Sequence, residues 1–246
     1  MLVERAYIPE FKRPADYDAW PYTVPCVAEL ADDGLAFERP ITFLVGENGS
    51  GKSTITEALA EAFKFDDRGG RNLGTYATDR PKTPLGEVLQ LDLTPQGSSV
   101  LRGPRSKRKG FFLRAETAMN LMEDRSGLRG YWEEDTAEMS HGEGFLTVFE
   151  SMFNEPLLYL MDEPEAALSF TSCLRLVGLM YRLGQTGAQV ICATHSPILA
   201  STPGADIIEF GDYGSRRSEW RNLDVVAHWR RYMENPAFYL RHITDD

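Results

Sequence analysis

The stretch ITFLVGENGSGKST, residues 41–54, decides the fold of this chain. Residues 41–45 are an apolar run, typical of a buried strand, and Gly46 opens a glycine-rich turn. From about residue 54 to residue 65, apolar side chains recur at helical spacing and form one core-facing stripe. A strand, a glycine-rich turn ending in Lys-Ser, and then a helix make the pattern of a phosphate-binding loop.

Each part of this loop has a chemical purpose. Glycines let the backbone wrap closely around phosphates, and successive N–H groups with the following helix N-terminus supply positive potential. Lys52 is predicted to act on the β- and γ-phosphates of a nucleoside triphosphate, and the Ser53 hydroxyl to bind Mg²⁺. The predicted nucleotide-binding residues are Gly46, Glu47, Asn48, Gly49, Ser50, Gly51, Lys52, Ser53 and Thr54. A glycine-rich turn without a ligand is the alternative, and the flanking strand and helix argue against it.

A second motif, LLYLMDEP, covers residues 157–164. An apolar strand that ends in Asp162 places a carboxylate at the carboxyl edge of a sheet, where ligand sites of α/β proteins lie. Asp162 is predicted to hold Mg²⁺ through water, and Glu163 to polarise the attacking water as a general base. Alone, the same residues would also suit the start of a helix, since acidic groups are favourable there.

Two further segments point to the same edge. His195 follows the apolar run 189–193, which would deliver its side chain to the γ-phosphate or the attacking water, although a lone histidine is more often structural. Ser140, His141, Gly142 and Glu143 open a helix marked by Phe145. Ser-x-x-Glu is a capping box, and a capped helix N-terminus with a glycine is also an anion site, so the structural and the functional interpretation are compatible.

The 246 residues, 42% of them hydrophobic, suit one large α/β domain. Strands at 157–161, 189–193 and 206–210 alternate with helices, one of them ending near Gly184, and predict a mainly parallel sheet. Residues 1–40 predict short strands at 24–30 and 35–37. Residues 66–109 read as a loop-rich insertion with a strand at 88–93, followed by a strand-like segment at 111–113.

Charge and cysteine content limit the function classes. The net charge of −11 argues against a surface built mainly for nucleic acid, although residues 102–109, RGPRSKRK, form a basic loop that could contact phosphates or simply be solvated. Three cysteines without paired spacing predict reduced thiols in or near the core of a cytoplasmic protein. No apolar run reaches membrane-spanning length and the N-terminus carries charges where a signal peptide is apolar, so we expect neither a transmembrane helix nor a signal peptide. A membrane is not among the expected partners.

Together, the Walker A segment 46–53, the Ser140 segment, the Walker B residues and His195 resemble the ABC ATPases in order and spacing. Ser140 lies 22 residues before Asp162, and His195 lies 33 residues after it. More narrowly, GENGSGKST, GFFLRAET, SHGEGFL, DEPEAALS, ATHSPILA and ENPAFYLRH are similar to a group of small soluble bacterial ATPases.

The resemblance implies a P-loop NTPase domain over residues 1–246, with a three-layer core and a mainly parallel sheet. Its expected parts are an N-terminal antiparallel β subdomain (1–40), a Walker A unit (41–65), a loop-rich and helical insertion (66–139) and a core of signature, Walker B and switch histidine with C-terminal helices (140–246). It implies ATP and Mg²⁺ as cofactors and an ATP-dependent homodimer, in which the P-loop of one subunit faces Ser140 and Gly142 of the other.

Several residues depart from the family pattern. His141 stands where transporters have Gly, Glu143 where they have Gln, and Ser169 where the family usually has Asp. No clear glutamine follows the P-loop at the usual distance, so Glu116 is the candidate for that metal-contacting position. Trp20 and Tyr22 are candidates for stacking on adenine, and ordinary core packing explains them equally well.

The expected function is ATP binding and Mg²⁺-dependent hydrolysis at a homodimer interface. It would drive a conformational switch, with an unknown protein partner, in DNA repair or phage defence. The 94 residues between Gly46 and Ser140 are too few for the long coiled-coil arms of repair ATPases. The ATPase subunit of an ABC membrane transporter is the alternative. A GTPase should carry Asn-Lys-x-Asp, which is absent from the sequence, and a small-molecule kinase would not need His195 and the Ser140 segment together.

Overall fold

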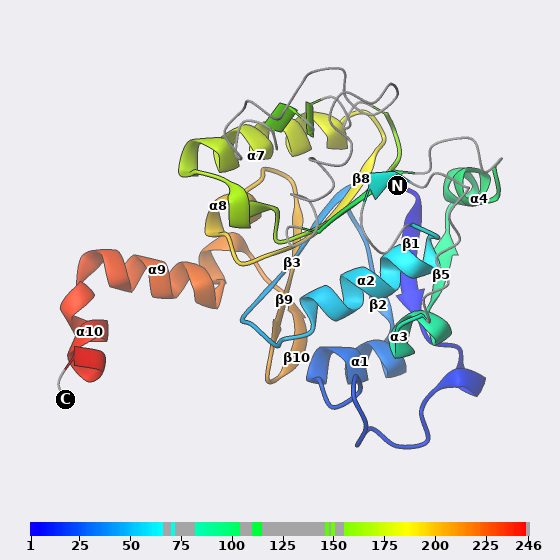
Figure 1. Ribbon diagram of the computed structural model, residues 1–246, viewed down its shortest axis with the longest axis horizontal. Coiled ribbons are helices and arrows are strands. Elements are labelled where there is room, and N and C mark those ends of the chain that lie inside the picture. Colours follow the sequence, from blue (N-terminus) through cyan, green and yellow to red (C-terminus); the bar gives the residue numbers. More distant parts are fainter. Residues whose placement is uncertain are drawn as a thin grey trace.

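A computed structural model describes residues 1–65, 70–71, 82–103, 110–114, 146–147, 149–150 and 155–244. Its main element is a seven-stranded sheet in the order β10-β9-β3-β8-β7-β6-β4 (Figure 1). The strands are β3 (Ile41–Gly46), β4 (Gly70–Arg71), β6 (Gly110–Arg114), β7 (Leu158–Asp162), β8 (Gln189–Thr194), β9 (Asp206–Gly211) and β10 (Gly214–Arg217). The five inner strands run parallel, and β4 and β10 pair antiparallel at the two edges.

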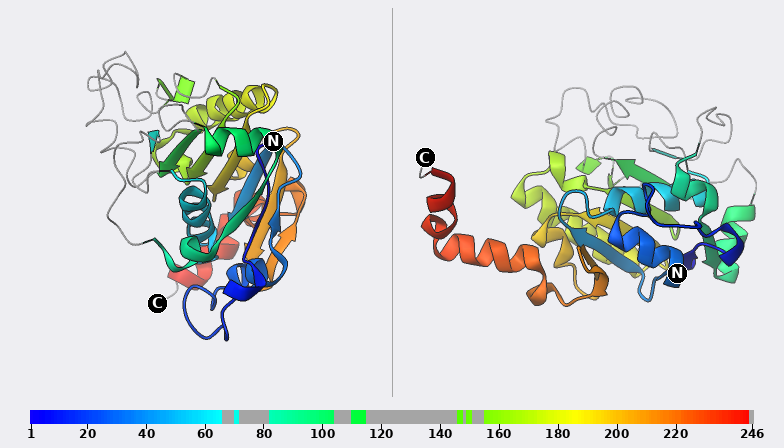
Figure 2. Two further views of the ribbon diagram at one scale, coloured as in Figure 1. Left: turned by 90° about the vertical axis from the view of Figure 1, so that its right-hand side faces the viewer. Right: turned by 90° about the horizontal axis from the view of Figure 1, so that it is seen from below.

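Helices cover both faces of this sheet (Figures 1 and 2). Helix α2 (Lys52–Ala62) packs on one face and α7 (Phe170–Gly184) on the other. Alternate side chains of each strand join opposite cores: Phe43 and Val45 pack with α7, whereas Leu44 packs with α2. The expected α/β fold, three layers around a mainly parallel sheet, is therefore confirmed.

A second, three-stranded antiparallel sheet has the order β2-β1-β5. It contains β1 (Val3–Tyr7), β2 (Leu35–Ala36) and β5 (Gln90–Leu93), so its third strand comes from the insertion. The buried side chain of Gln189 joins the two sheets, because its Oε1 accepts from the Leu2 and Val3 amides at 2.8 Å each and its Nε2 donates to the Val3 carbonyl at 2.9 Å. The small N-terminal antiparallel sheet confirms that part of the predicted fold.

The strand predicted at residues 24–30 is wrong, because this segment forms helix α1 (Pro25–Asp33). Pro25 occupies the first turn of the helix, where its missing N–H costs nothing. Buried side chains at Cys26, Val27, Leu30 and Ala31 follow helical spacing, and Gly34 ends the helix at φ 72°. The Pro25 start and the packing of one face decide for a helix.

The described part of the insertion, chiefly residues 82–103, is more regular than its composition predicted. Two helices, α3 (Pro84–Val88) and α4 (Pro95–Arg102), flank β5, so the strand expected over 88–93 begins only at Gln90. Each helix starts at a Thr-Pro pair: Thr83 accepts from the Gly86 amide at 3.1 Å, and Thr94 from the Gly97 amide at 3.0 Å. Threonine, proline and glycine therefore act here as helix-start residues rather than as loop formers.

The remaining described elements complete the chain. They are the short helices η1 (Glu10–Lys12), η2 (Pro164–Ala167), α8 (Pro197–Ala200) and η3 (Trp220–Asn222), with α9 (Asp224–Glu234) and α10 (Pro236–Thr244) near the C-terminus. Helices α9 and α10 extend away from the sheet (Figure 2). Among the described residues, no helix has both the length and the apolar character needed to cross a membrane.

Candidate nucleotide-binding site

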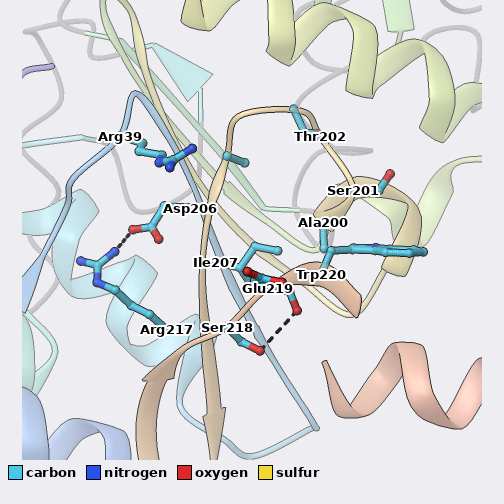
Figure 3. A pocket seen from close by; sticks show the side chains of 11 residues that line it. Arg39, Ala200, Ser201, Thr202, Asp206, Ile207, Arg217, Ser218, Glu219 and Trp220 are labelled. Carbon is cyan, nitrogen blue, oxygen red and sulfur yellow. Dashed lines mark hydrogen bonds and ion pairs between the residues drawn. The ribbon is translucent and has the colours of Figure 1, made fainter. Parts of the chain in front are cut away.

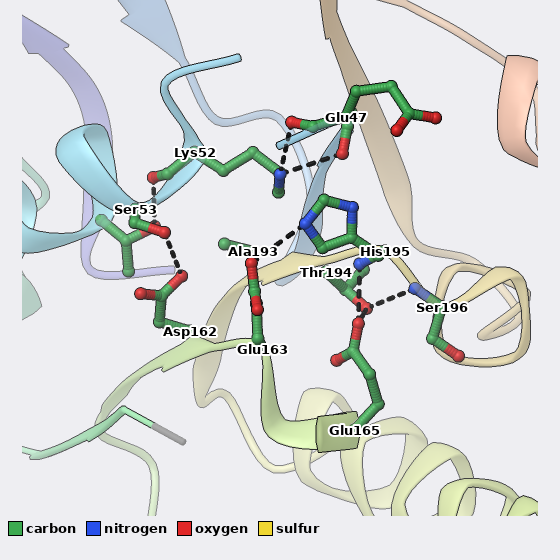
Figure 4. Close-up of polar contacts among 12 residues, drawn as sticks. Glu47, Lys52, Ser53, Asp162, Glu163, Glu165, Ala193, Thr194, His195 and Ser196 are labelled. Carbon is green, nitrogen blue, oxygen red and sulfur yellow. Dashed lines mark hydrogen bonds and ion pairs between the residues drawn. The ribbon is translucent and has the colours of Figure 1, made fainter. Parts of the chain in front are cut away.

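The parallel topology brings three predicted segments to one edge of the main sheet. Strand β3 is hydrogen-bonded to β8, and β8 to β7, so their carboxyl ends lie side by side. In the register, Val45 lies opposite Thr194, and Asp162 lies opposite Ala193. The P-loop, the Walker B carboxylates and His195 therefore meet at this edge, as Figure 4 shows.

The loop is held in shape by its glycines and by its own lysine. Gly51 starts α2 with φ 96°, and a Cβ there would lie 2.6 Å from the Cys26 sulfur. The buried Lys52 ammonium donates to the Gly46 carbonyl at 2.9 Å and to the Glu47 carbonyl at 3.0 Å. Burial lowers the pKa of Lys52, and the nearby carboxylates of Glu163 and other acidic residues act in the opposite direction. This places a cation inside the loop, where phosphate oxygens would replace the carbonyls.

Ser53 and Asp162 form the oxygen pair expected of a magnesium site. The Ser53 hydroxyl donates to Asp162 Oδ1 at 3.0 Å, although the two residues are 109 positions apart. Burial raises the pKa of Asp162 from 3.8 to about 6, while the Ser53 bond and the Arg114 charge lower it. Hydroxyl and carboxylate oxygens are ligands that Mg²⁺ prefers, and a bound cation would offset the cost of this buried charge. The residues present fit the ion.

Glu163 and His195 face each other beside this pair. Glu163 adopts a left-handed conformation, φ 51° and ψ 49°, and its amide donates to the Ala193 carbonyl at 2.9 Å. Its Oε1 lies 3.0 Å from His195 Nε2, and both side chains remain about a third exposed, at 38% and 30%. A non-glycine residue at positive φ is uncommon and is often found at functional sites. This conformation places the Glu163 carboxylate beside the His195 imidazole, at the strand ends that also carry the P-loop.

Glu165 belongs to the same network, and its contacts were not predicted from the sequence. Its Oε1 accepts from the Thr194 hydroxyl and from the His195 amide, each at 2.6 Å. Thr194 Oγ1 in turn accepts from the Ser196 amide at 2.9 Å. The only sequence signal is the second Glu of Asp-Glu-Pro-Glu, and nothing in that pattern indicates its hydrogen-bond partners.

Some predicted site residues lie outside the described part of the chain. These are Ser140, His141, Gly142, Glu143, Glu116, Phe145 and residues 104–109 of the basic loop. Ser169, which stands where the family usually has Asp, caps α7 by accepting from the Ser172 amide at 3.2 Å. Trp20 is 59% exposed, and Tyr22 packs edge-on against Tyr17. Stacking of either ring on adenine stays a prediction.

Of the cavities in the described part of the chain, two differ in their relation to the predicted site residues. One, of about 430 Å³, is lined by Glu47–Ser50 of the P-loop and by residues of the β9–β10 hairpin, including Tyr213. The other, of about 440 Å³, lies where β9 begins and is drawn in Figure 3. Its Arg217 pairs with Asp206 and Glu38, and its Arg39 donates to the Gly204 carbonyl. The second cavity contains none of the predicted site residues.

Comparison with protein families decides the classification. The family model described as ABC transporter matches residues 36–166, slightly more than half of the chain, and includes the P-loop and Walker B residues. The chain belongs to this ABC family. The matched part is its ATPase domain, which hydrolyses ATP. A second model, described as an AAA domain, matches residues 144–201.

Similar proteins match much of this chain over a small part of their own length. ABC transporter G family member 21 of Dictyostelium discoideum is 25% identical over 91% of this chain and 18% of its own length. ABC transporter G family member 2 of Arabidopsis thaliana is 28% identical over 67% of this chain and 24% of its own length. The chain thus spans about a fifth of the length of these relatives. Among solved structures, the SMC head domain from Thermotoga maritima matches with a TM-score of 0.50 at 15% identity, over 89% of this chain and 98% of that one, which supports the fold.

Proposed function

We propose that this ABC ATPase works as a nucleotide-operated homodimer. ATP bound to the P-loop of one subunit would be closed over by the Ser140 segment of a second copy, and hydrolysis would release the two. The observation that carries the catalytic half is the 3.0 Å contact between Glu163 and His195, next to Lys52 and the Ser53–Asp162 pair. The dimer itself rests on the family resemblance of the Ser140 segment.

Each residue has a defined task in this mechanism. Lys52 leaves the Gly46 and Glu47 carbonyls for the β- and γ-phosphates and neutralises their charge. Glu163 accepts a proton from the attacking water, and His195 holds Glu163 and contacts the γ-phosphate. Ser53 and Asp162 would hold Mg²⁺, which, when bound, withdraws electron density from the phosphate oxygens. Every one of these groups comes from a single subunit, and the second would supply the covering segment.

The test is Glu163→Gln, which keeps the size of the side chain and removes its proton affinity. Turnover should fall by about 100-fold or more, because a general base contributes that much. ATP binding should persist, and ATP should accumulate a species of twice the 27.7 kDa chain mass in light scattering. Glu61→Gln is the matched control, since Glu61 accepts from the Thr83 amide away from this site. Normal turnover in Glu163→Gln would refute the base assignment, and a variant that binds ATP as a monomer would refute the dimer.

A second candidate is the ATPase subunit of a membrane transporter. It is favoured by the similar proteins, which are ABC transporter G family members. This candidate requires a membrane-embedded partner, so the protein should sediment with membranes of its native host and its hydrolysis should respond to that partner. A protein that is found only in the supernatant and dimerises with ATP alone supports the homodimer instead.

A nucleic-acid role in DNA repair or phage defence depends on residues 102–109. Binding through such a basic run should weaken steeply with salt, because released counterions drive it. If DNA neither stimulates hydrolysis nor binds in a salt-sensitive way, this role is excluded.

A further inference from the structure

Glu165 lies two residues after Glu163, in the short helix η2 that follows the Walker B strand. Glu163 in its left-handed conformation and the buried Pro164 precede Glu165, whose side chain contacts the end of β8. Figure 4 shows its carboxylate directed at Thr194 and His195 rather than at the P-loop. Its contacts are therefore with the end of β8 and not with the P-loop.

Four hydrogen bonds join residues 163–165 to residues 193–195. The Glu163 amide donates to the Ala193 carbonyl, and Glu163 Oε1 contacts His195 Nε2. The other two converge on Glu165 Oε1, which accepts from the Thr194 hydroxyl and the His195 amide at 2.6 Å each. His195 is thus held at two points: its backbone by Glu165 and its ring by Glu163.

The strand cannot hold His195 by itself. The paired part of β8 ends at Thr194, so the His195 amide has left the sheet ladder and needs another acceptor. Thr194 is fully buried, and both hydrogen bonds to Glu165 are short, at 2.6 Å each. The second carboxylate oxygen, Oε2, is buried without a hydrogen-bond partner among the described residues. One oxygen of this carboxylate therefore accepts both described hydrogen bonds. Burial of the other oxygen without a partner costs desolvation free energy.

We propose that Glu165 is a positioning residue that holds the His195 backbone so that its imidazole meets Glu163. Glu165 touches neither ATP nor water in this role and acts through His195. The inference rests on the proposed function for its effect on turnover, but the anchoring of the His195 amide can be measured without turnover.

Three substitutions separate geometry from charge. Glu165→Ala removes the acceptor, and Glu165→Asp keeps the charge but withdraws it by one methylene. Glu165→Gln loses the charge but keeps an acceptor oxygen in place. Alanine and aspartate should lower kcat by about 10- to 100-fold, because small misplacements of catalytic groups cost that much. Glutamine should stay within about threefold of the parent, and the KM for ATP should change little in all three. Glutamine failing while aspartate works would overturn the proposal, and this pair decides even if the alanine variant does not fold.

A double-mutant cycle with His195→Ala tests whether Glu165 acts through that residue. In the His195→Ala background, Glu165→Ala should lower kcat by less than about twofold, because the group it positions is gone. A loss as large as in the parent chain would overturn the proposal and assign Glu165 a separate effect. Glu61→Ala removes a carboxylate that also accepts a backbone amide, and it should lower the melting temperature without this coupling.

Hydrogen exchange at the His195 amide gives the readout that does not need activity. Exchange should accelerate by about tenfold or more in Glu165→Asp, and stay near the parent rate in Glu165→Gln. Unchanged exchange in Glu165→Asp would overturn the proposal. If the parent chain fails to hydrolyse ATP, the proposed function fails, and the exchange experiment still decides on Glu165.

Discussion

Asp162→Asn should stabilise the nucleotide-free protein while abolishing its magnesium-dependent turnover. The side chain is only 7% exposed, and burial raises its pKa from 3.8 to about 6. A carboxyl whose folded pKa is raised binds its proton more tightly in the folded state, so ionising it costs stability. At 1.36 kcal/mol per pKa unit, the rise of about two units costs about 3 kcal/mol at neutral pH. Asparagine keeps an acceptor oxygen for Ser53 and carries no charge to desolvate.

The pH dependence has a defined sign. Below about pH 4 the aspartate is protonated in the folded and the unfolded chain, and it costs nothing. As the pH rises from about 4 to about 6, the folded parent loses stability because Asp162 must ionise while buried. Above about pH 6 the full cost of this buried charge is present. The advantage of Asp162→Asn in free energy of unfolding should therefore be largest at pH 7.5 and should shrink as the pH falls to 4.5.

Urea unfolding in EDTA at pH 7.5 and pH 4.5 measures this difference. For a chain of this size each kcal/mol corresponds to about 2–4 °C in melting temperature, so calorimetry should show it as well. Addition of Mg²⁺ and ATP should raise the melting temperature of the parent more than that of the variant, because binding to the folded state alone stabilises it. A variant that is destabilised equally at both pH values would refute the reasoning, since burial of the charge would then not be the dominant effect.

Two further substitutions test local parts of the structure. Gly51→Ala should lower stability by about 1–3 kcal/mol and weaken ATP binding, because its φ of 96° is strained for alanine and its Cβ would lie 2.6 Å from the Cys26 sulfur. Equal ATP affinity in isothermal titration would contradict this, and Gly204→Ala controls for positive φ alone, since nothing lies within 4 Å of its Cβ. Thr94→Ala should lower the free energy of unfolding by about 1 kcal/mol, measured in urea, because it removes the cap of α4. ATP turnover should not change. A change in kcat would show that the small sheet is coupled to the site.

Some of the structure follows from short-range patterns. The apolar run before Gly46, the glycine spacing and the Lys-Ser pair predict a strand, a turn and a helix, because each depends on neighbours within a few residues. The same holds for the strands ending at Asp162 and Thr194. Short-range patterns gave wrong predictions where tertiary packing or a side-chain cap decides. The segment 24–30, predicted as a strand, lies mostly in α1. Thr83 and Thr94 cap helices in a stretch predicted to be rich in loops.

The sequence by itself predicted that a P-loop, two adjacent carboxylates and a histidine lie at strand ends, and therefore that the chain binds and hydrolyses a nucleotide. Only the tertiary structure decided how they meet. Strand order puts β8 between β3 and β7, which brings Ser53 to Asp162 and the Glu163 carboxylate to His195. The proposed role of Glu165 depends on the left-handed conformation of Glu163 and on the point where the β8 ladder ends. Hydrogen bonds between residues about 30 positions apart cannot be predicted from a periodic sequence pattern. Their geometry is set by the sheet and not by residues adjacent in the sequence.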